Sequence, residues 1–185
     1  MLAWLNKYRV RRRTARSLYG SIVTAARRPG FYADWGVPDT VQGRFELILL
    51  HLVLLQHRLG AEGQPGARLA QALSETFVVD MDDGMREMTF GDLAVPREVK
   101  RATAALFDRY RAYLAALADA NDILMQDALR SQMAYLDDSG NVDVLRLSAY
   151  AREACRALDG QAAARILGGD VVWPDLPAAA SPGNP

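Results

Sequence analysis

The sequence predicts an all-α protein, a single-domain bundle of about five to six helices around a buried, apolar central helix, with a disordered C-terminal tail. Three observations support this. Half of the 185 residues are hydrophobic, and the β-branched residues are scattered instead of alternating as in strands. One apolar segment suits a helix but is shorter than the roughly 20 residues that span a bilayer. Amphipathic segments precede and follow it.

The central helix is predicted to begin after the loop that contains Asp39 and to end near Gly60. Asp39 is expected to cap it, with Gln42 three residues later completing a capping box. Gly60 suits the left-handed residue just past a helix end. Residues 45–55 leave almost no polar face, so other helices must enclose the segment. A membrane-inserted hairpin is the less favoured alternative, because His51 interrupts the apolar run.

The chain before the central helix is strongly basic. Its first 33 residues contain eight lysines and arginines and no acid, whereas the whole chain has zero net charge, so the remainder carries eight negative charges. Residues 17–28 have the apolar spacing of an amphipathic helix, which Pro29 and Gly30 are expected to stop. Residues 1–16 are predicted to form a basic arm. The first domain boundary is therefore placed between residues 16 and 17.

The basic arm combines aromatic and apolar residues with arginines. Such a segment could lie on an anionic membrane surface or against RNA phosphates, for example on a ribosome. A solvated arm without a partner is the alternative, since short arginine runs are common at chain ends. DNA is not an expected partner. The residues assigned to membrane or RNA contact are Trp4, Lys7, Arg9, Arg11, Arg12 and Arg13.

The rest of the chain is predicted to add further helices to one helical domain, residues 17–168. The segment AEGQPG is expected to be a loop, and an amphipathic helix carrying Leu69, Leu73 and Phe77 follows it. Pro96 is placed to begin another helix. Shorter helices are predicted over 122–136 and 142–158, around a turn at DDSGN. Residues 169–185 form a Pro/Gly-rich tail, from which Trp173 is expected to pack back onto the body.

No combination of residues predicts catalysis. The acidic cluster that begins at Asp80 does not place glycine and glutamate as a calcium-binding EF-hand loop requires. His51 and His57 are six residues apart, which turns them to different helix faces, so neither is expected to bind metal. Cys155 is expected to be a packed small residue. No nucleophile elbow or phosphate-binding loop occurs. We therefore expect no catalytic residue, no metal, no cofactor and no enzymatic activity.

Arg44 and Glu46 place charge at the start of a helix that should otherwise be buried. Buried charges are costly unless they are paired or face a partner. Two interpretations follow. In the first, an internal salt bridge pins the preceding loop to the helix. In the second, the two side chains line a pocket that faces a client protein.

Two long motifs and one short one resemble the ubiquinol-cytochrome c chaperone family in its alphaproteobacterial form. They are LYGSIVTAARRPGFYADWGVPDTVQGRFELILLHLVLL, FVVDMDDGMREMTFGDLAVPREVKR and, more weakly, ILGGDVVWP. The resemblance implies an all-helical assembly factor for the cytochrome bc1 complex that binds newly made cytochrome b. It also implies a small partner protein and a position in the bacterial cytoplasm, peripherally at the inner membrane, or on the matrix side in a mitochondrion.

The resemblance transfers no catalytic residues. If its motifs form the surface that binds a client or partner, the candidate residues are Phe31, Tyr32, Asp39, Arg44, Glu46, Asp80, Asp82, Arg86, Glu87 and Asp92. The alternative function is that of a helical carrier for a small hydrophobic ligand such as haem, quinone or lipid. That function would require a cavity between the helices.

Overall fold

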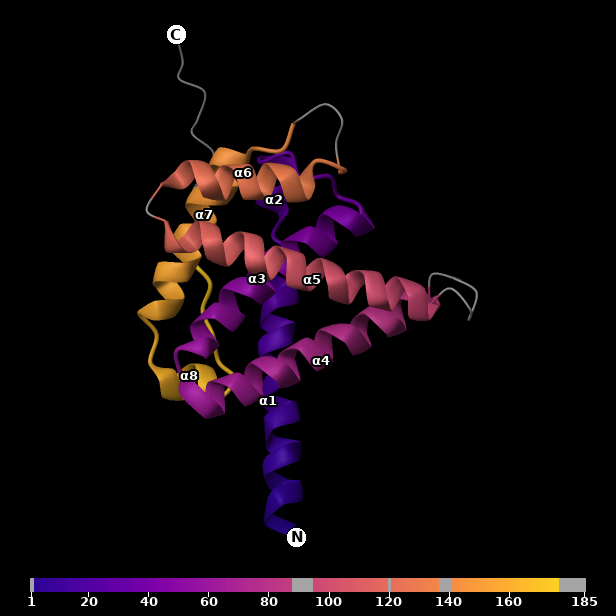
Figure 1. Ribbon diagram of the computed structural model, residues 1–185, viewed down its shortest axis with the longest axis vertical. Coiled ribbons are helices and arrows are strands. Elements are labelled where there is room, and N and C mark those ends of the chain that lie inside the picture. Colours follow the sequence, from indigo (N-terminus) through magenta and orange to yellow (C-terminus); the bar gives the residue numbers. More distant parts are fainter. Residues whose placement is uncertain (1, 88–94, 120, 137–140, 177–185) are drawn as a thin grey trace.

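The computed structural model describes residues 2–87, 95–119, 121–136 and 141–176, and in these ranges it is helical with no strand (Figure 1). This confirms the predicted all-α class. The helices are α1 (Leu2–Ala26), α2 (Pro29–Ala33), α3 (Val41–Gly60), α4 (Gly63–Glu87), α5 (Val95–Ala118), α6 (Asp122–Met133), α7 (Val144–Asp159) and α8 (Ala163–Leu167). Six of them are long, in agreement with the predicted number, and the five-residue helices α2 and α8 were not predicted.

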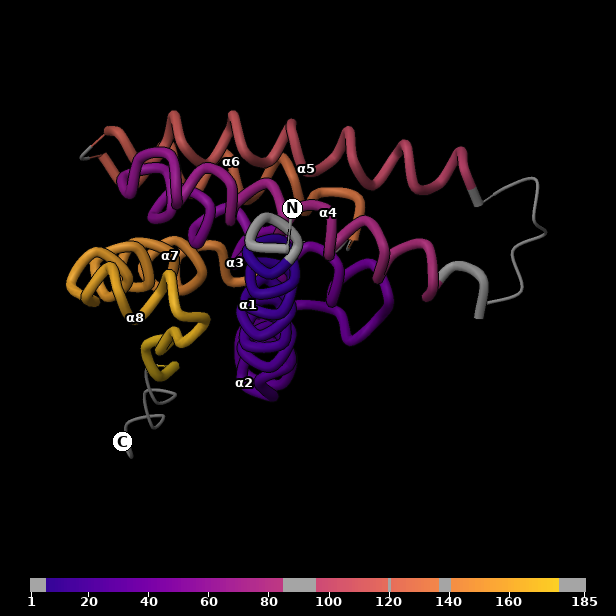
Figure 2. The backbone as a smooth tube through the Cα atoms, turned by 90° about the horizontal axis from the view of Figure 1, so that it is seen from below, coloured from indigo at the N-terminus to yellow at the C-terminus, as the bar shows by residue number. Residues whose placement is uncertain are grey.

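The helices form layers around α3. Helices α1 and α4 pack against one side of α3 and against each other, and α5 and α7 cover its remaining sides. Helix α6 lies between α5 and α7 and completes the bundle. In Figure 2 the layer of α5 and α6 is separated from α1 by α3 and α4. The central helix is therefore enclosed by protein, as its composition required.

Helix α3 supplies the middle of the hydrophobic core. All of its residues from Glu46 to Gln56 are buried, and complete burial of one leucine side chain contributes about 2 kcal/mol. Neighbouring helices add their apolar stripes, among them Leu18 and Ile22 from α1 and Leu73 and Phe77 from α4. In the described part of the chain, no helix combines the length and the hydropathy that crossing a membrane requires.

The start of α3 corrects the predicted cap. Thr40, not Asp39, is the capping residue, and its hydroxyl accepts a hydrogen bond of 3.1 Å from the Gly43 amide. Asp39 instead accepts a hydrogen bond from Arg44. Gly43 is required because the loop folds back onto the helix: a Cβ atom there would lie 2.0 Å from the Pro38 carbonyl oxygen. The GVPDTVQGRFEL motif thus encodes a loop seated tightly on a helix.

The predicted end of α3 and one predicted loop were wrong, whereas α1 ends at Ala26, before Pro29, as predicted. Gly60 is still part of α3, and Gly63 is the residue with positive φ (59°), at the first position of α4. The segment AEGQPG is therefore mostly helical. Pro65 lies in the first turn of α4, and Pro29 is the first residue of α2. Proline fits the first turn of a helix, where its missing N–H has no partner in any case.

The C-terminal segment packs back onto the body, as predicted for Trp173. The Trp173 ring is only 6% exposed and its Nε1 donates a hydrogen bond of 2.9 Å to the Ser21 hydroxyl on α1. The ring centroid lies 4.8 Å from that of His51 on α3. Residues 170–176 are irregular. The predicted disorder of the last residues and the DDSGN turn concern residues outside the described ranges, apart from Asn141.

Residues 2–16 do not form a separate element. They are the beginning of α1, and the helix continues through residue 16 without a break. The N-terminal part of α1 projects beyond the other helices, along the long axis of the molecule (Figure 1). The basic part of the chain is therefore a helical extension of the body.

Candidate functional site

A groove lies where the start of α3, the end of α4 and the first half of α5 meet. It has a volume of about 840 Å³. Arg27, which follows α1, and Tyr135, which follows α6, also line it. The lining residues are Arg27, Val41, Gln42, Arg44, Phe45, Ile48, Asp80, Met81, Asp83, Gly84, Glu98, Arg101, Ala102, Ala105, Arg109 and Tyr135.

The floor of the groove is apolar. Ile48 and Ala102 are buried at 7% and 6% exposure, and Phe45, Met81 and Ala105 pack partly buried against the same core. The Phe45 ring is supported from below by Phe77, with ring centroids 6.1 Å apart. This floor is continuous with the hydrophobic core, so the groove is formed by the fold itself. Apolar surface of this kind favours binding of an apolar partner by the hydrophobic effect.

The rim of the groove is charged, and most of its charges already have partners. The Arg44 Nε donates to Asp39 at 2.7 Å, which lowers the pKa of that carboxyl group. Glu98 accepts hydrogen bonds from two arginines on α5, one of which is Arg101. Asp80 accepts a hydrogen bond of 2.7 Å from the Tyr19 hydroxyl on α1. Arg44, Glu98 and Arg101 are therefore paired within the protein, whereas Asp80 keeps its negative charge because its partner is a neutral hydroxyl.

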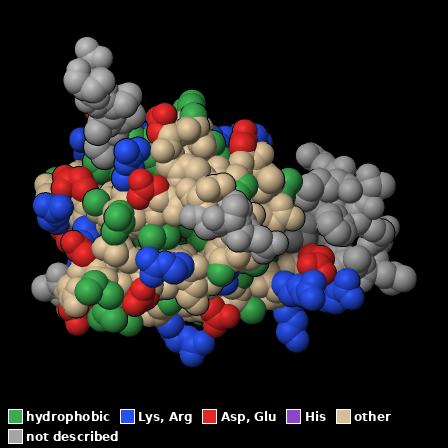
Figure 3. Space-filling view, turned by 90° about the horizontal axis from the view of Figure 1, so that it is seen from above, with side chains coloured by type: hydrophobic (Ala, Val, Ile, Leu, Met, Phe, Trp, Pro, Cys, Tyr) green, Lys and Arg blue, Asp and Glu red, His purple; other side chains and the backbone are tan. Residues whose placement is uncertain are grey.

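Figure 3 shows the molecule from above, with acidic, basic and hydrophobic side chains intermixed on that face. The two signs of charge are not segregated into one acidic and one basic half. This face therefore does not select a partner that carries charge of only one sign. The same mixture characterises the groove rim, which carries both arginines and carboxylates.

A buried ion pair lies beneath one end of the groove. The Glu46 side chain is fully buried on α3, and the guanidinium of Arg109 on α5 donates to both of its carboxylate oxygens. The hydroxyl of Tyr135, which follows α6, donates a third hydrogen bond at 2.7 Å. Burial and the charge of Glu46 raise the pKa of Tyr135. The network ties α3, α5 and the end of α6 together at the groove.

Tyr113 lies near this network without joining it. Its ring is completely buried, and its hydroxyl has no hydrogen-bond partner among the described residues. Burial, and then the charge of Glu46, raise its pKa, so the hydroxyl stays protonated. The ring fills the core between α5 and its neighbours, and no chemical task follows from its position.

The structure brings some of the predicted site residues together and separates others. Arg44 and Asp80 line the groove, and Asp39 is held at its rim by Arg44. Asp82 and Tyr32 are half-buried and do not line it. Phe31 is a correction: its ring is fully buried against Trp35 and Tyr150, with centroids 5.1 Å from each, so it cannot contact a client.

Glu46 is the second correction, because its buried carboxylate faces Arg109 and not a partner. The predicted internal salt bridge is therefore two separate pairs, Arg44 with Asp39 and Glu46 with Arg109. The pair at Asp39 does pin the loop to the helix. Three other candidates remain untested. Asp92 lies outside the described residues, and so do the side chains of Arg86 and Glu87, whose backbone ends α4.

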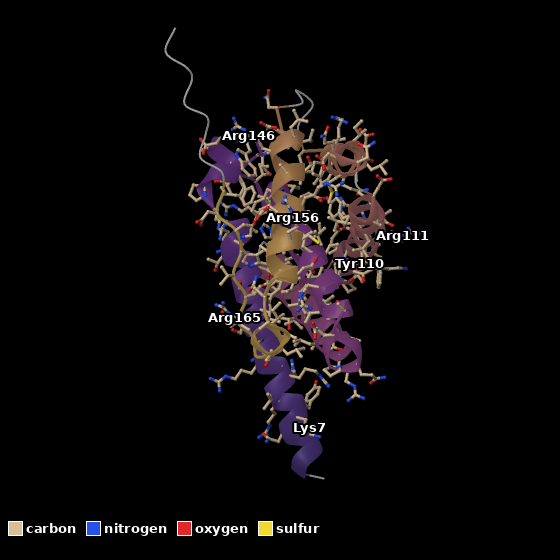
Figure 4. All side chains as sticks on the ribbon, turned by 90° about the vertical axis from the view of Figure 1, so that its left-hand side faces the viewer. Lys7, Tyr110, Arg111, Arg146, Arg156 and Arg165 are labelled. Carbon is tan, nitrogen blue, oxygen red and sulfur yellow. The ribbon has the colours of Figure 1, made fainter. Side chains whose placement is uncertain are left out.

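The basic residues assigned to membrane or RNA contact form a separate region on α1. Lys7, Arg9, Arg12 and Arg13 are exposed, and Arg11 is half-buried. The side chain of Trp4 lies outside the described residues. Figure 4 shows Lys7 on the part of α1 that projects below the body, away from Arg111 and Tyr110 on α5. This region and the groove are thus independent candidates for binding.

His51 is a structural residue. Its Nδ1 is 2.7 Å from the Leu47 carbonyl oxygen, and its Nε2 is 2.8 Å from the Tyr150 hydroxyl. The carbonyl can only accept, so Nδ1 carries the proton and Nε2 accepts from Tyr150. Burial lowers the His51 pKa to about 4, which keeps the ring neutral. Both nitrogens are occupied, as expected for a hydrogen-bonded helix residue.

The other candidates for metal or thiol chemistry do not form a site. Among the described residues, no three His, Cys, Asp or Glu side chains come together as a metal would require. Burial and the nearby Asp159 raise the pKa of the Cys155 thiol, which disfavours the reactive thiolate. The groove is therefore a binding surface without an evident catalytic group.

Sequence reasoning missed the contribution of α5 to the groove. Glu98, Arg101, Ala102 and Arg109 come from that helix. The position of Arg109 could have predicted a contact, because it lies inside the buried stripe of α5 and a charge there requires an acidic partner from another helix. Glu46 has no other buried cation near it in sequence. Matching the two isolated charges would have predicted the pair, although not its place beside a groove.

Comparisons with known proteins agree with the fold. The model of a family described as Ubiquinol-cytochrome C chaperone matches residues 33–173, which is more than half of the chain. The crystal structure of the Cbp3 homolog from Brucella abortus superimposes with a TM-score of 0.82 at 30% sequence identity. The match covers 95% of this chain and 98% of that one. No curated protein matches the chain.

Proposed function

The chain belongs to the ubiquinol-cytochrome C chaperone family, and from this premise we propose that it assists assembly of the cytochrome bc1 complex by binding newly made cytochrome b in the groove between α3, α4 and α5. The role is one of binding and release, with no chemical step. The observation that carries the proposal is the combination of an apolar floor that is continuous with the core and a charged rim on which Arg44, Glu98 and Arg101 are paired within the protein.

The groove suits an apolar or amphipathic segment of a membrane protein that has not yet reached its final partners. Its floor offers Phe45, Ile48 and Met81 to such a segment, and Val41 stands 58% exposed at its edge. A helical segment laid in an apolar groove buries one face and leaves the other in water. The paired rim charges attract neither cations nor anions strongly. The client can therefore leave the groove when the other subunits of the bc1 complex compete for it.

The carrier function receives less support from the site. Haem binding through His51 would require breaking its hydrogen bonds to both Leu47 and Tyr150 inside the core. Loss of buried hydrogen bonds costs about 1–3 kcal/mol for each group left without a partner. The groove is open and rimmed by charge, which suits a protein segment better than an enclosed haem or quinone.

Site-specific photocrosslinking tests the proposal directly. A photoreactive phenylalanine analogue placed at Val41 should crosslink to cytochrome b in cells that are assembling the bc1 complex. The same analogue at Leu145 is the matched control, because Leu145 is similarly exposed (62%) but lies on α7 outside the groove. Crosslinks from both positions, or from Leu145 alone, would contradict the groove as the binding surface. Absence of cytochrome b from both would contradict the client.

A further inference from the structure

The outward face of α1 is basic and unobstructed. Arg9, Arg13, Arg16, Gly20 and Thr24 follow one another at intervals of three or four residues, so they share one face of the helix. All five are exposed. At 1.5 Å per residue the face extends over about 22 Å. The proposed client groove does not include any of these residues.

The arginines on this face are not neutralised by the protein. The first 33 residues contain no acid. In the part of the chain that the structure describes, Arg9, Arg13 and Arg16 form no ion pair, and Arg12 beside them also forms none. Four guanidinium groups therefore lie within two turns of helix without a counter-charge. Like charges four residues apart on a helix repel each other modestly, and guanidinium groups bind phosphate oxygens with two hydrogen bonds each.

The shape of the face indicates what kind of anion it meets. The opposite side of α1 carries Ala15, Leu18 and Ile22, which are fully buried in the core, so the body lies behind the helix (Figure 2). A Cβ atom at Gly20 would have no neighbour within 4 Å. A flat surface can therefore approach the basic residues along the helix without meeting another element.

An RNA strand is less well matched to this face. Recognition of single-stranded RNA relies on exposed aromatic rings that stack with bases. Among the side chains that the structure describes, the aromatic ring beside the stripe is Tyr8, and the guanidinium groups of Arg11 and Arg12 lie over it at 5.6 and 5.7 Å from its centroid. We propose that the outward face of α1 binds the phosphate groups of an anionic lipid bilayer. This places the protein peripherally at a membrane, whichever client the groove holds.

Sedimentation with lipid vesicles tests this assignment with the full chain. Vesicles of phosphatidylcholine that contain phosphatidylglycerol should bind the protein at low salt, and vesicles of phosphatidylcholine alone should not. Each arginine near an anionic surface strengthens binding about fivefold, so R9Q/R13Q/R16Q should weaken it roughly a hundredfold. High salt should also weaken binding of the wild type.

The matched control is R111Q/R130Q/R156Q, which removes the same number of positive charges from α5, α6 and α7. These arginines are exposed and pair with carboxylates three residues earlier in their helices, and Figure 4 shows Arg111 and Arg156 away from the projecting part of α1. The control should bind vesicles like the wild type. Equal losses in both variants, or no binding of the wild type to anionic vesicles, would overturn the proposal. So would tighter binding to a single-stranded RNA oligomer at the same salt.

Discussion

Replacement of Glu46 by Gln isolates the contribution of the buried ion pair. Gln keeps the shape of the side chain and can still accept the hydrogen bond from Tyr135, but it leaves the Arg109 charge without a counter-ion. Glu46 is fully buried, and the Arg109 side chain is 12% exposed at the groove. Removing one partner of a buried pair costs about 3–5 kcal/mol. Because Arg109 opens toward the groove and its water, we expect the low end, a loss of about 3 kcal/mol in the free energy of unfolding.

Urea denaturation followed by circular dichroism measures this loss. The matched control is Asp39→Asn, which breaks the pair with Arg44, a pair in which both side chains are about half exposed. Exposed ion pairs contribute little to stability, so the control should stay close to the wild type. The double variant E46L/R109M replaces the pair by apolar groups and should be more stable than Glu46→Gln alone.

A Glu46→Gln variant that loses less than about 1 kcal/mol would refute this reasoning, because that is the range of exposed pairs. The single variants E46L and R109M complete the double-mutant cycle. A loss in E46L/R109M that equals the sum of these two single losses would refute the reasoning as well, since paired residues must show coupling. Either result would mean that the network at the groove does not act as a unit.

Three further predictions concern positions away from this pair. Acidification from about pH 6.5 to about pH 4 should lower the free energy of unfolding by roughly 3 kcal/mol, because the pKa of His51 is about 4 in the fold and only the unfolded chain binds the extra proton in this range. Urea titrations of the His51→Gln variant should show a smaller decline, and an unchanged decline would contradict this prediction. Gly43→Ala should lower the free energy of unfolding by about 2 kcal/mol, because the new Cβ atom would collide with a backbone carbonyl, whereas Gly20→Ala at an exposed helix position should raise it by about 1 kcal/mol. Thermal melts that show the same effect for both variants would contradict the role of Gly43. Trp173→Ala should cost about 3–5 kcal/mol through loss of a buried ring, while Val172→Ala should have little effect; equal melting temperatures would mean that the C-terminal segment does not stabilise the body.

The helical bundle could be predicted because its signals are local and repeated. The apolar run in α3 and the stripes of the long helices each extend over several turns, so one misplaced residue does not change the assignment. Helix ends depend on single residues. Asp39 and Thr40 are both good caps, and the choice between them depends on the Pro38 carbonyl packing on Gly43 and on the pairing of Asp39 with Arg44.

The candidate site was only partly predictable because its residues come from distant parts of the chain. The motif around Arg44 located one wall of the groove, and the acidic cluster that includes Asp80 located another. The third wall comes from α5. The position of Arg109 in a buried stripe indicates an acidic partner such as Glu46, but it does not indicate that the pair lies beside a groove. Phe31 shows the opposite error, since an aromatic residue in a motif was assigned to the surface although it builds the core beneath that motif.

A reduced-minus-oxidised difference spectrum tests whether the groove binds cytochrome b. It is recorded on membranes from cells that lack the gene and carry a groove variant. Ala105→Trp fills the groove, because Ala105 lines its floor, and Ala104→Trp places the same ring on an exposed position of α5 outside it. We expect Ala104→Trp to restore the b-type haem signal of the bc1 complex and Ala105→Trp not to restore it, although both proteins fold. A normal b-type haem signal with Ala105→Trp would contradict the assignment of the groove as the surface that binds cytochrome b.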